Sequence, residues 1–184
     1  MPRVLWKGLL KATMLTFTLS GIVSCQKTEG INQFLPTPTE SWGLQDTLFF
    51  ELPEIMHDND FDVLVQARIA YTYPYRSLRL VVEQAYGESD SIAAYKETVA
   101  PDLERKNQVR TYRDTVLLDL VDDCGNFTGK GRDLLEYDMP VRYIHMQSGE
   151  SGEIRIFHVQ AESNIRGVHD VGLQITPLKK TQDK

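Results

Sequence analysis

The sequence predicts an all-β fold, an antiparallel two-sheet β-sandwich of about seven or eight strands with a jelly-roll or immunoglobulin-like arrangement. Three observations predict it. Apolar and polar side chains alternate with a period of two from Trp42 onward, turn-forming residues separate the alternating segments, and helical periodicity is nearly absent. The chain is 41% hydrophobic and 25% charged, which is a globular composition, and its length of 184 residues favours one domain. We place this domain at 41–178, followed by a tail at 179–184.

The first 24 residues have the layout of a secretory signal peptide. Three basic side chains, the last at Lys11, precede an uncharged stretch at 12–23. As a helix this stretch would span only about 18 Å, which is short of the ~30 Å hydrocarbon core of a bilayer. Ile22-Val23-Ser24-Cys25 then resembles a lipobox, where bacteria acylate the cysteine and cleave just before it. We predict a lipid anchor at Cys25; the alternative is an ordinary secretory signal that contains a cysteine.

A polar segment with two prolines follows, and we predict that 25–40 are the lipidated cysteine and a flexible tether. At ~3.1 Å per residue, an extended tether would reach about 45 Å. The chain has a net charge of −6, and residues 1–24 hold three basic and no acidic side chains, so their removal would leave −9. Such an acidic chain lacks the charge pattern of a nucleic-acid-binding protein, and we expect no nucleic acid partner.

The clearest strand runs from Phe61 to Tyr73. Its odd-numbered side chains form an apolar face, while Gln66 and Arg68 fall on the other face. On this assignment Ile69→Asp should cost several kcal/mol, because it buries an unpaired charge, whereas Gln66→Asp should be mild.

The other strands are shorter, and a long insertion interrupts them. We assign 87–109 to this insertion, in which 89–106 could form a brief helix that ends at Pro101. Further strands are expected around 48–52, 78–82, 116–120, 141–146, 154–159 and 171–175.

The residue patterns that could indicate a metal, phosphate or catalytic site do not match the motifs that such sites require. The aspartates at 58, 60 and 62 open like a calcium loop, but Val63 and Ile69 stand where that loop needs a glycine and a carboxylate. The glycines of 125–131 do not make a phosphate loop, because Lys130 is followed by a glycine, and they favour positive φ or close packing. Cys124 lies among acidic residues and is interpreted as a turn residue. We predict no catalytic residue, no metal site and no cofactor.

An aromatic cluster, Tyr71-Thr72-Tyr73-Pro74-Tyr75, is the most unusual local feature. Exposed rings on a sandwich could stack on sugars or anchor a protein partner. Tyr71 and Tyr73 are odd-numbered, like the apolar residues of the preceding strand, so the alternation favours a place for them on the core face. It does not decide whether Tyr75 is buried or exposed. Arg68, Tyr73 and Tyr75 are the candidate residues for contacting a partner or a glycan.

A set of short motifs runs in order along the mature chain. The motifs are Ser41-Trp42, Asp46-Thr47-Leu48, Arg68, Tyr73-Pro74-Tyr75, Leu78, Asp114-Thr115, Gly125, Gly129, Gly131, Gly152, Gly167 and Asp170-Val171-Gly172-Leu173. Together with the lipobox, this ordered set resembles the gliding-motility lipoprotein GldH family. The resemblance implies an envelope lipoprotein of the gliding machinery, which is tied to type IX secretion, with no enzymatic activity and no catalytic or ligand residues.

Two functions are therefore expected. The first is a scaffold or interaction module that is held to the membrane through Cys25 and binds other envelope lipoproteins of the gliding and secretion assembly. The second is a cell-surface lipoprotein that binds glycans through a sandwich resembling a carbohydrate-binding module. Both place the protein in the cell envelope, with the outer membrane favoured over the inner one.

Overall fold

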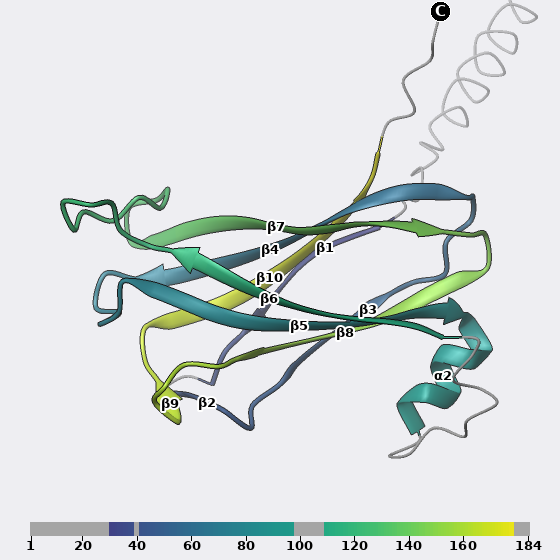
Figure 1. Cartoon of the computed structure of the whole chain (residues 1–184), viewed down its shortest axis with the longest axis horizontal. Helices are drawn as coiled ribbons and strands as arrows, with labels where there is room; N and C mark the ends of the chain where they lie inside the picture. Colours follow the sequence, from purple (N-terminus) through teal and green to yellow (C-terminus); the bar gives the residue numbers. More distant parts are fainter. Residues whose placement is uncertain (1–29, 39–40, 98–108, 179–184) are drawn as a thin grey trace, which may run out of the picture.

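A computed structural model describes residues 30–38, 41–97 and 109–178. The predicted signal peptide, the anchor at Cys25 and the tail at 179–184 lie outside the described residues. The described chain is mostly β-strand, and two four-stranded antiparallel sheets pack face to face, which confirms the predicted two-sheet sandwich (Figure 1).

Each sheet is named here after its long central strand. The β4 sheet has the order β1 (Ile31–Pro36), β10 (Val168–Pro177), β4 (Asn59–Ala70) and β7 (Leu134–Met146). The β5 sheet has the order β3 (Leu48–Leu52), β8 (Glu150–His158), β5 (Ser77–Glu88) and β6 (Arg110–Asp119). A third, two-stranded ladder pairs β2 (Trp42–Gly43) with β9 (Asn164–Ile165).

The strands pair in mirror order along the chain. β1 pairs with β10, β2 with β9, β3 with β8, β4 with β7 and β5 with β6, and every pair is antiparallel. The chain is thus one long hairpin rolled into two layers, which is the jelly-roll arrangement. Of the two arrangements that the sequence left open, the immunoglobulin-like one is therefore wrong.

The core lies between the sheets, where the predicted alternation is confirmed on five strands. The apolar side chains that the alternation places inward on β3, β4, β5, β10 and the second half of β6 are at most 9% exposed. Tyr112 and Asp114, earlier on β6, are only partly buried. The prediction fails at the end of β4, because the strand stops at Ala70. Tyr71 lies in the following turn and is 52% exposed, whereas Tyr73 returns to the core and is 3% exposed.

The predicted tether is too long, because Ile31–Pro36 form β1 and pair with β10 along their whole length. The proline that suggested a linker, Pro36, is the last residue of an edge strand, where a missing N–H is tolerated. The folded domain therefore includes residues before 41.

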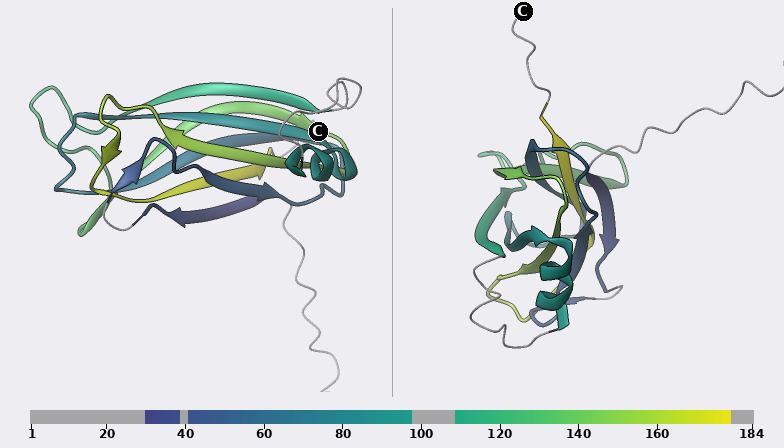
Figure 2. Two further views of the ribbon diagram at one scale, coloured as in Figure 1. Left: turned by 90° about the horizontal axis from the view of Figure 1, so that it is seen from below. Right: turned by 90° about the vertical axis from the view of Figure 1, so that its right-hand side faces the viewer.

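The predicted insertion starts two residues too early. Gly87 and Glu88 still belong to β5 and pair with Ser151 and Glu150 of β8. Helix α2 (Ser89–Glu97) follows and packs on the outer side of the β5 sheet, at the end of the sandwich seen in Figure 2. Its Ile92 forms a small apolar cluster with Ala85 and Val109. Among the described residues, no helix is both long and apolar enough to cross a membrane.

The glycines of 125–131 have the structural roles that the sequence suggested. Gly131 has a φ of +138°, and a Cβ there would lie 1.9 Å from the carbonyl oxygen of Leu134. A Cβ on Gly129 would lie 2.6 Å from the ring of Tyr137. The interpretation of these residues as backbone and packing glycines is confirmed.

Candidate interaction surface

The three candidate residues named from the sequence do not share a surface. The Tyr73 ring is buried, its hydroxyl donates to the Ser77 carbonyl at 3.2 Å, and it accepts a hydrogen bond from Gln160 Nε2 at 2.9 Å. Burial raises the pKa of Tyr73 to about 12. Tyr73 is 3% exposed and its ring belongs to the core, so the geometry gives its predicted contact with a partner or glycan no support.

The other two tyrosines of the aromatic cluster, Tyr71 and Tyr75, contact different residues. Tyr75 is half-buried and packs edge-to-face on Tyr73, with ring centroids 5.3 Å apart. Tyr71 instead packs perpendicular to Phe127, at 5.6 Å. The cluster that looked continuous in the sequence is therefore split between the core and the surface.

Arg68 lies on the outer face of the β4 sheet, where it has partners within the fold. Its Nε donates to Glu136 Oε2 at 3.0 Å, and its Nη1 is 3.7 Å from Asp170 Oδ2. The guanidinium also lies over the ring of Phe34, with Cζ 3.8 Å from the ring centroid. Arg68 therefore joins β1, β10, β4 and β7 across the sheet.

Polar side chains beside Arg68 are buried although they face away from the core. Gln66 is 7% exposed and its Nε2 donates to Asp138 Oδ1 at 2.9 Å. Asp170 is 8% exposed. Gln66 Oε1 and Asp170 Oδ1 are, among the described residues, buried side-chain oxygens without a hydrogen-bond partner. Such atoms are costly, because a buried acceptor has lost its water.

A polar network connects the two sheets between β6 and β7, and it is buried at Tyr86 and Gln84 and partly exposed at Asp114 and Arg142. The Tyr86 hydroxyl donates to Gln84 Oε1 at 2.7 Å, and Gln84 Nε2 donates to Asp114 Oδ2 at 2.9 Å. Arg142 binds both oxygens of Asp114, at 2.7 and 2.6 Å, and lies over the Tyr112 ring. Burial raises the pKa of Tyr86, which therefore keeps its proton as a donor. Of the residues in this network, sequence reasoning had singled out only Asp114.

His158 is the fully buried histidine of β8. Its Nε2 donates to the Trp42 carbonyl at 3.0 Å, and its ring packs against Trp42 with centroids 5.2 Å apart. Burial lowers the pKa of His158, so the ring is neutral and fastens the short β2 strand to the β5 sheet. Within the described part of the chain, no group of three His, Cys, Asp or Glu side chains is placed to hold a metal ion.

Cys124 is exposed in a turn, as predicted. The turn is closed by Asp122, whose Oδ1 accepts from the Asn126 N–H at 2.8 Å. This hydrogen bond lowers the pKa of Asp122.

The outer face of the β5 sheet presents a row of arginine and aromatic side chains. The strand register places Phe49, Arg155, Glu83 and Arg113 in one line across β3, β8, β5 and β6. The Arg155 guanidinium lies 5.6 Å from the ring centroid of Phe49, and Arg113 forms an ion pair with Glu83. This line is called the arginine–aromatic row below.

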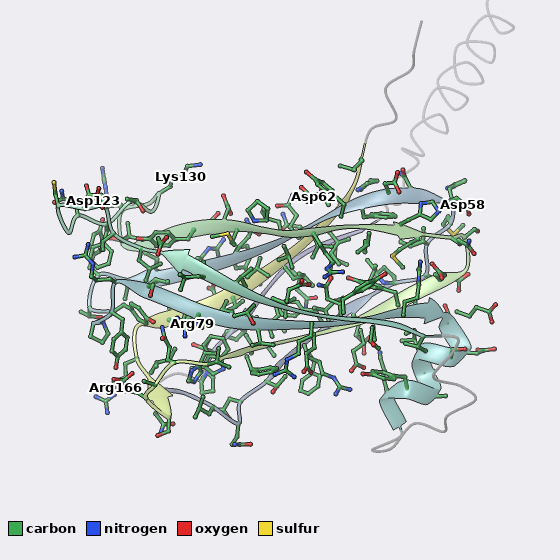
Figure 3. All side chains as sticks on the ribbon, viewed as in Figure 1. Asp58, Asp62, Arg79, Asp123, Lys130 and Arg166 are labelled. Atoms are coloured by element: carbon green, nitrogen blue, oxygen red, sulfur yellow. The ribbon has the colours of Figure 1, made fainter. Side chains whose placement is uncertain are left out.

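Apolar side chains flank the arginine–aromatic row. Phe49 is 56% exposed and Leu117, on β6, is 43% exposed. Arg79, which is labelled in Figure 3, pairs with Leu117 across the sheet. A shallow hollow of about 620 Å³ opens at the β3 end of the row and is lined by Pro36, Thr37, Pro38, Gln45, Asp46, Thr47, Leu48 and Phe49. The row, Leu117 and this hollow together make a candidate surface for a partner.

Comparison with known proteins finds no protein-family model that matches the chain and no curated protein that matches it. The functional argument therefore depends on the residues themselves.

Gln66→Asp should be destabilising rather than mild. The substitution removes the amide group that donates to Asp138 and places a second carboxylate beside the carboxylate of Asp138. Because position 66 is buried, we expect the free energy of unfolding to fall by about 1–3 kcal/mol. Chemical denaturation of Gln66→Asp, Ile69→Asp and the exposed control Thr72→Asp measures the effect. A Gln66→Asp variant as stable as Thr72→Asp would contradict this account of the outer face.

Arg142 and Asp114 should couple strongly. Their bidentate pair is partly shielded, so a double-mutant cycle with Arg142→Met and Asp114→Leu should give a coupling free energy of about 1–3 kcal/mol. The more exposed pair of Arg113 and Glu83 is the matched control and should give less than about 1 kcal/mol. Equal coupling in both cycles would mean that the network does not join the sheets.

His158 should make the fold sensitive to acid. Its pKa is lowered in the folded state, so below about pH 6.5 the unfolded chain takes up a proton that the folded chain does not, and stability falls as the pH falls. The limit for one proton is about 1.4 kcal/mol per pH unit. The unfolding free energy between pH 7 and 5 should decline less steeply in His158→Gln than in wild type or in His57→Gln. If the unfolding free energy of all three proteins declined equally with pH, His158 would not be the cause of the acid sensitivity.

Proposed function

We propose that this chain is a non-enzymatic lipoprotein of the cell envelope that acts as an interaction module for other envelope lipoproteins of the gliding-motility and type IX secretion-associated machinery. The signal-like N-terminus with Cys25 supports the anchor, and the ordered motifs similar to the GldH family support the assembly.

The observation that carries an interaction role is the arginine–aromatic row. Protein interfaces are enriched in arginine and aromatic side chains, which supply large contact areas and charge-assisted hydrogen bonds. Here Phe49 and Leu117 are exposed beside arginines that the strand register holds in line. The β-strands on which they stand are fixed by the core, so the surface is preorganised for a partner.

Crosslinking in intact cells, followed by recovery of the tagged protein from membranes, tests this role. Wild type should recover motility or secretion components, and Phe49→Asp should lose most of them, at least about tenfold, because it places a carboxylate in the contact. Tyr143→Asp is the matched control, since Tyr143 is 72% exposed on the other sheet. Recovery of no such component by wild type, or equal recovery by Phe49→Asp, would count against the proposal.

The anchor is tested separately. Cys25→Ser should move the protein from the membrane pellet to the soluble fraction, because the acyl chains hold it at the bilayer. Mass spectrometry of the wild-type protein should find acyl chains on Cys25 at a new N-terminus, and an unmodified thiol at residue 25 would contradict the lipoprotein assignment.

Glycan binding remains a second proposal, supported by Tyr71, whose exposed ring packs on Phe127. Affinity electrophoresis in envelope polysaccharide would favour it if wild type is retarded and both Tyr71→Ala and Tyr75→Ala are not. No retardation of wild type would remove it.

A further inference from the structure

Strand β1 is held along one edge only. Among the strands that the structure describes, its six residues pair with β10 alone, and none of the six is fully buried. The three β10 side chains that lie opposite its inner face, Val171, Leu173 and Ile175, are in contrast completely buried. β1 therefore covers an apolar edge that is important to the core while it buries little of itself.

A small set of contacts fastens β1. The ring of Phe34 lies on Gly172, where a Cβ would come within 2.7 Å of the ring, and the guanidinium of Arg68 also lies over this ring. After the strand, Thr37 Oγ1 donates to the Val168 carbonyl at 2.6 Å and the Thr37 N–H donates to His169. These contacts would recognise the same segment wherever it came from.

The docked strand lies beside two unsatisfied oxygens. In the cross-strand rows, Gln66 follows Phe34 and Gly172, and Asp170 is the direct partner of Pro36. Gln66 Oε1 and Asp170 Oδ1 are buried there without a partner. Departure of β1 would give both oxygens access to water, and this gain opposes the loss of the strand contacts.

From these observations we propose that β1 is exchangeable, and that the β10 edge accepts the 30–38 segment of a second copy of this chain to form a strand-exchanged dimer. Each copy in such a dimer regains every β1 contact of the monomer, so exchange costs little beyond the entropy of association. Only residues 37–41 separate β1 from β2, and short connections of this kind favour exchange over closure. The proposal does not depend on the proposed function.

Disulfide trapping between copies tests the exchange. In the full chain with Cys124→Ser, one preparation carries Asn32→Cys and another carries Gln174→Cys. These positions are antiparallel partners, whose Cα atoms lie about 4.5–5.5 Å apart in such ladders, within the range of a disulfide. Oxidation of the mixed preparations should give a dimer in which mass spectrometry finds the 32–174 linked peptide. Neither preparation alone can form that peptide.

Two controls make the result decisive. The double variant Asn32→Cys/Gln174→Cys reports whether the pair can bridge within one chain, and it should give a linked monomer at high dilution. Wild-type copies with two different affinity tags should co-purify after incubation, and the oxidised double variant should not. If the mixed preparations give no 32–174 peptide and the tagged copies do not co-purify, the proposal is overturned. Co-purification that persists in the oxidised double variant overturns it as well, because the contact is then elsewhere.

The rate of exchange gives a further check. Phe34→Ala should speed formation of the linked peptide about tenfold, because it removes the ring held by Gly172 and Arg68. Phe49→Ala, on the opposite sheet, should leave the rate unchanged. Equal rates for the two variants would mean that opening of β1 does not control the reaction.

Discussion

Pairing between the two halves of the chain, in reverse order, is the constraint on which the other features depend. Because β5 pairs with β6 at the centre of the sequence and β1 pairs with β10 at its ends, every inner strand is fixed from both sides. This pairing brings side chains that are distant in sequence into single rows. The Arg68 contacts and the arginine–aromatic row are products of register rather than of local sequence, whereas the Arg142–Asp114 pair forms where β7 of one sheet packs against β6 of the other.

The same constraint explains why the interior is predictable and the surfaces are not. A period of two decides which side chains point inward, so the faces of β3, β5, β6 and β10 follow from the sequence. It does not decide what covers the outward side chains. Gln66 was assigned to the correct face, yet it is buried there beside Phe34 and Gly172, because β1 lies on a sheet edge that alternation cannot locate.

The candidate interaction surface was even harder to predict from the sequence than the burial of the outer sheet faces. Tyr71 and Tyr73 have the right parity for the core, but β4 stops at Ala70 and the turn reverses the outcome for one of them. Phe49 and Arg113 stand on strands far apart in the sequence, and only the register of four strands makes them neighbours in one surface. No local motif encodes such a row. The one signal for such a surface that a sequence could offer is an aromatic residue near an arginine, both at strand positions that point away from the core.

The docking of β1 also limits how far the domain can stand from a bilayer. Only five peptide steps separate Cys25 from Gly30, which span at most about 18 Å. An acylated Cys25 would thus keep the start of β1 close to the headgroups, at the same end of the sandwich as Asp58 and Asp62 (Figure 3). Carboxylates facing anionic lipid are repelled. The short connection to the anchor and this repulsion together favour a domain whose long axis stands away from the membrane surface. The outer faces of both sheets then remain open to neighbouring proteins in the membrane plane.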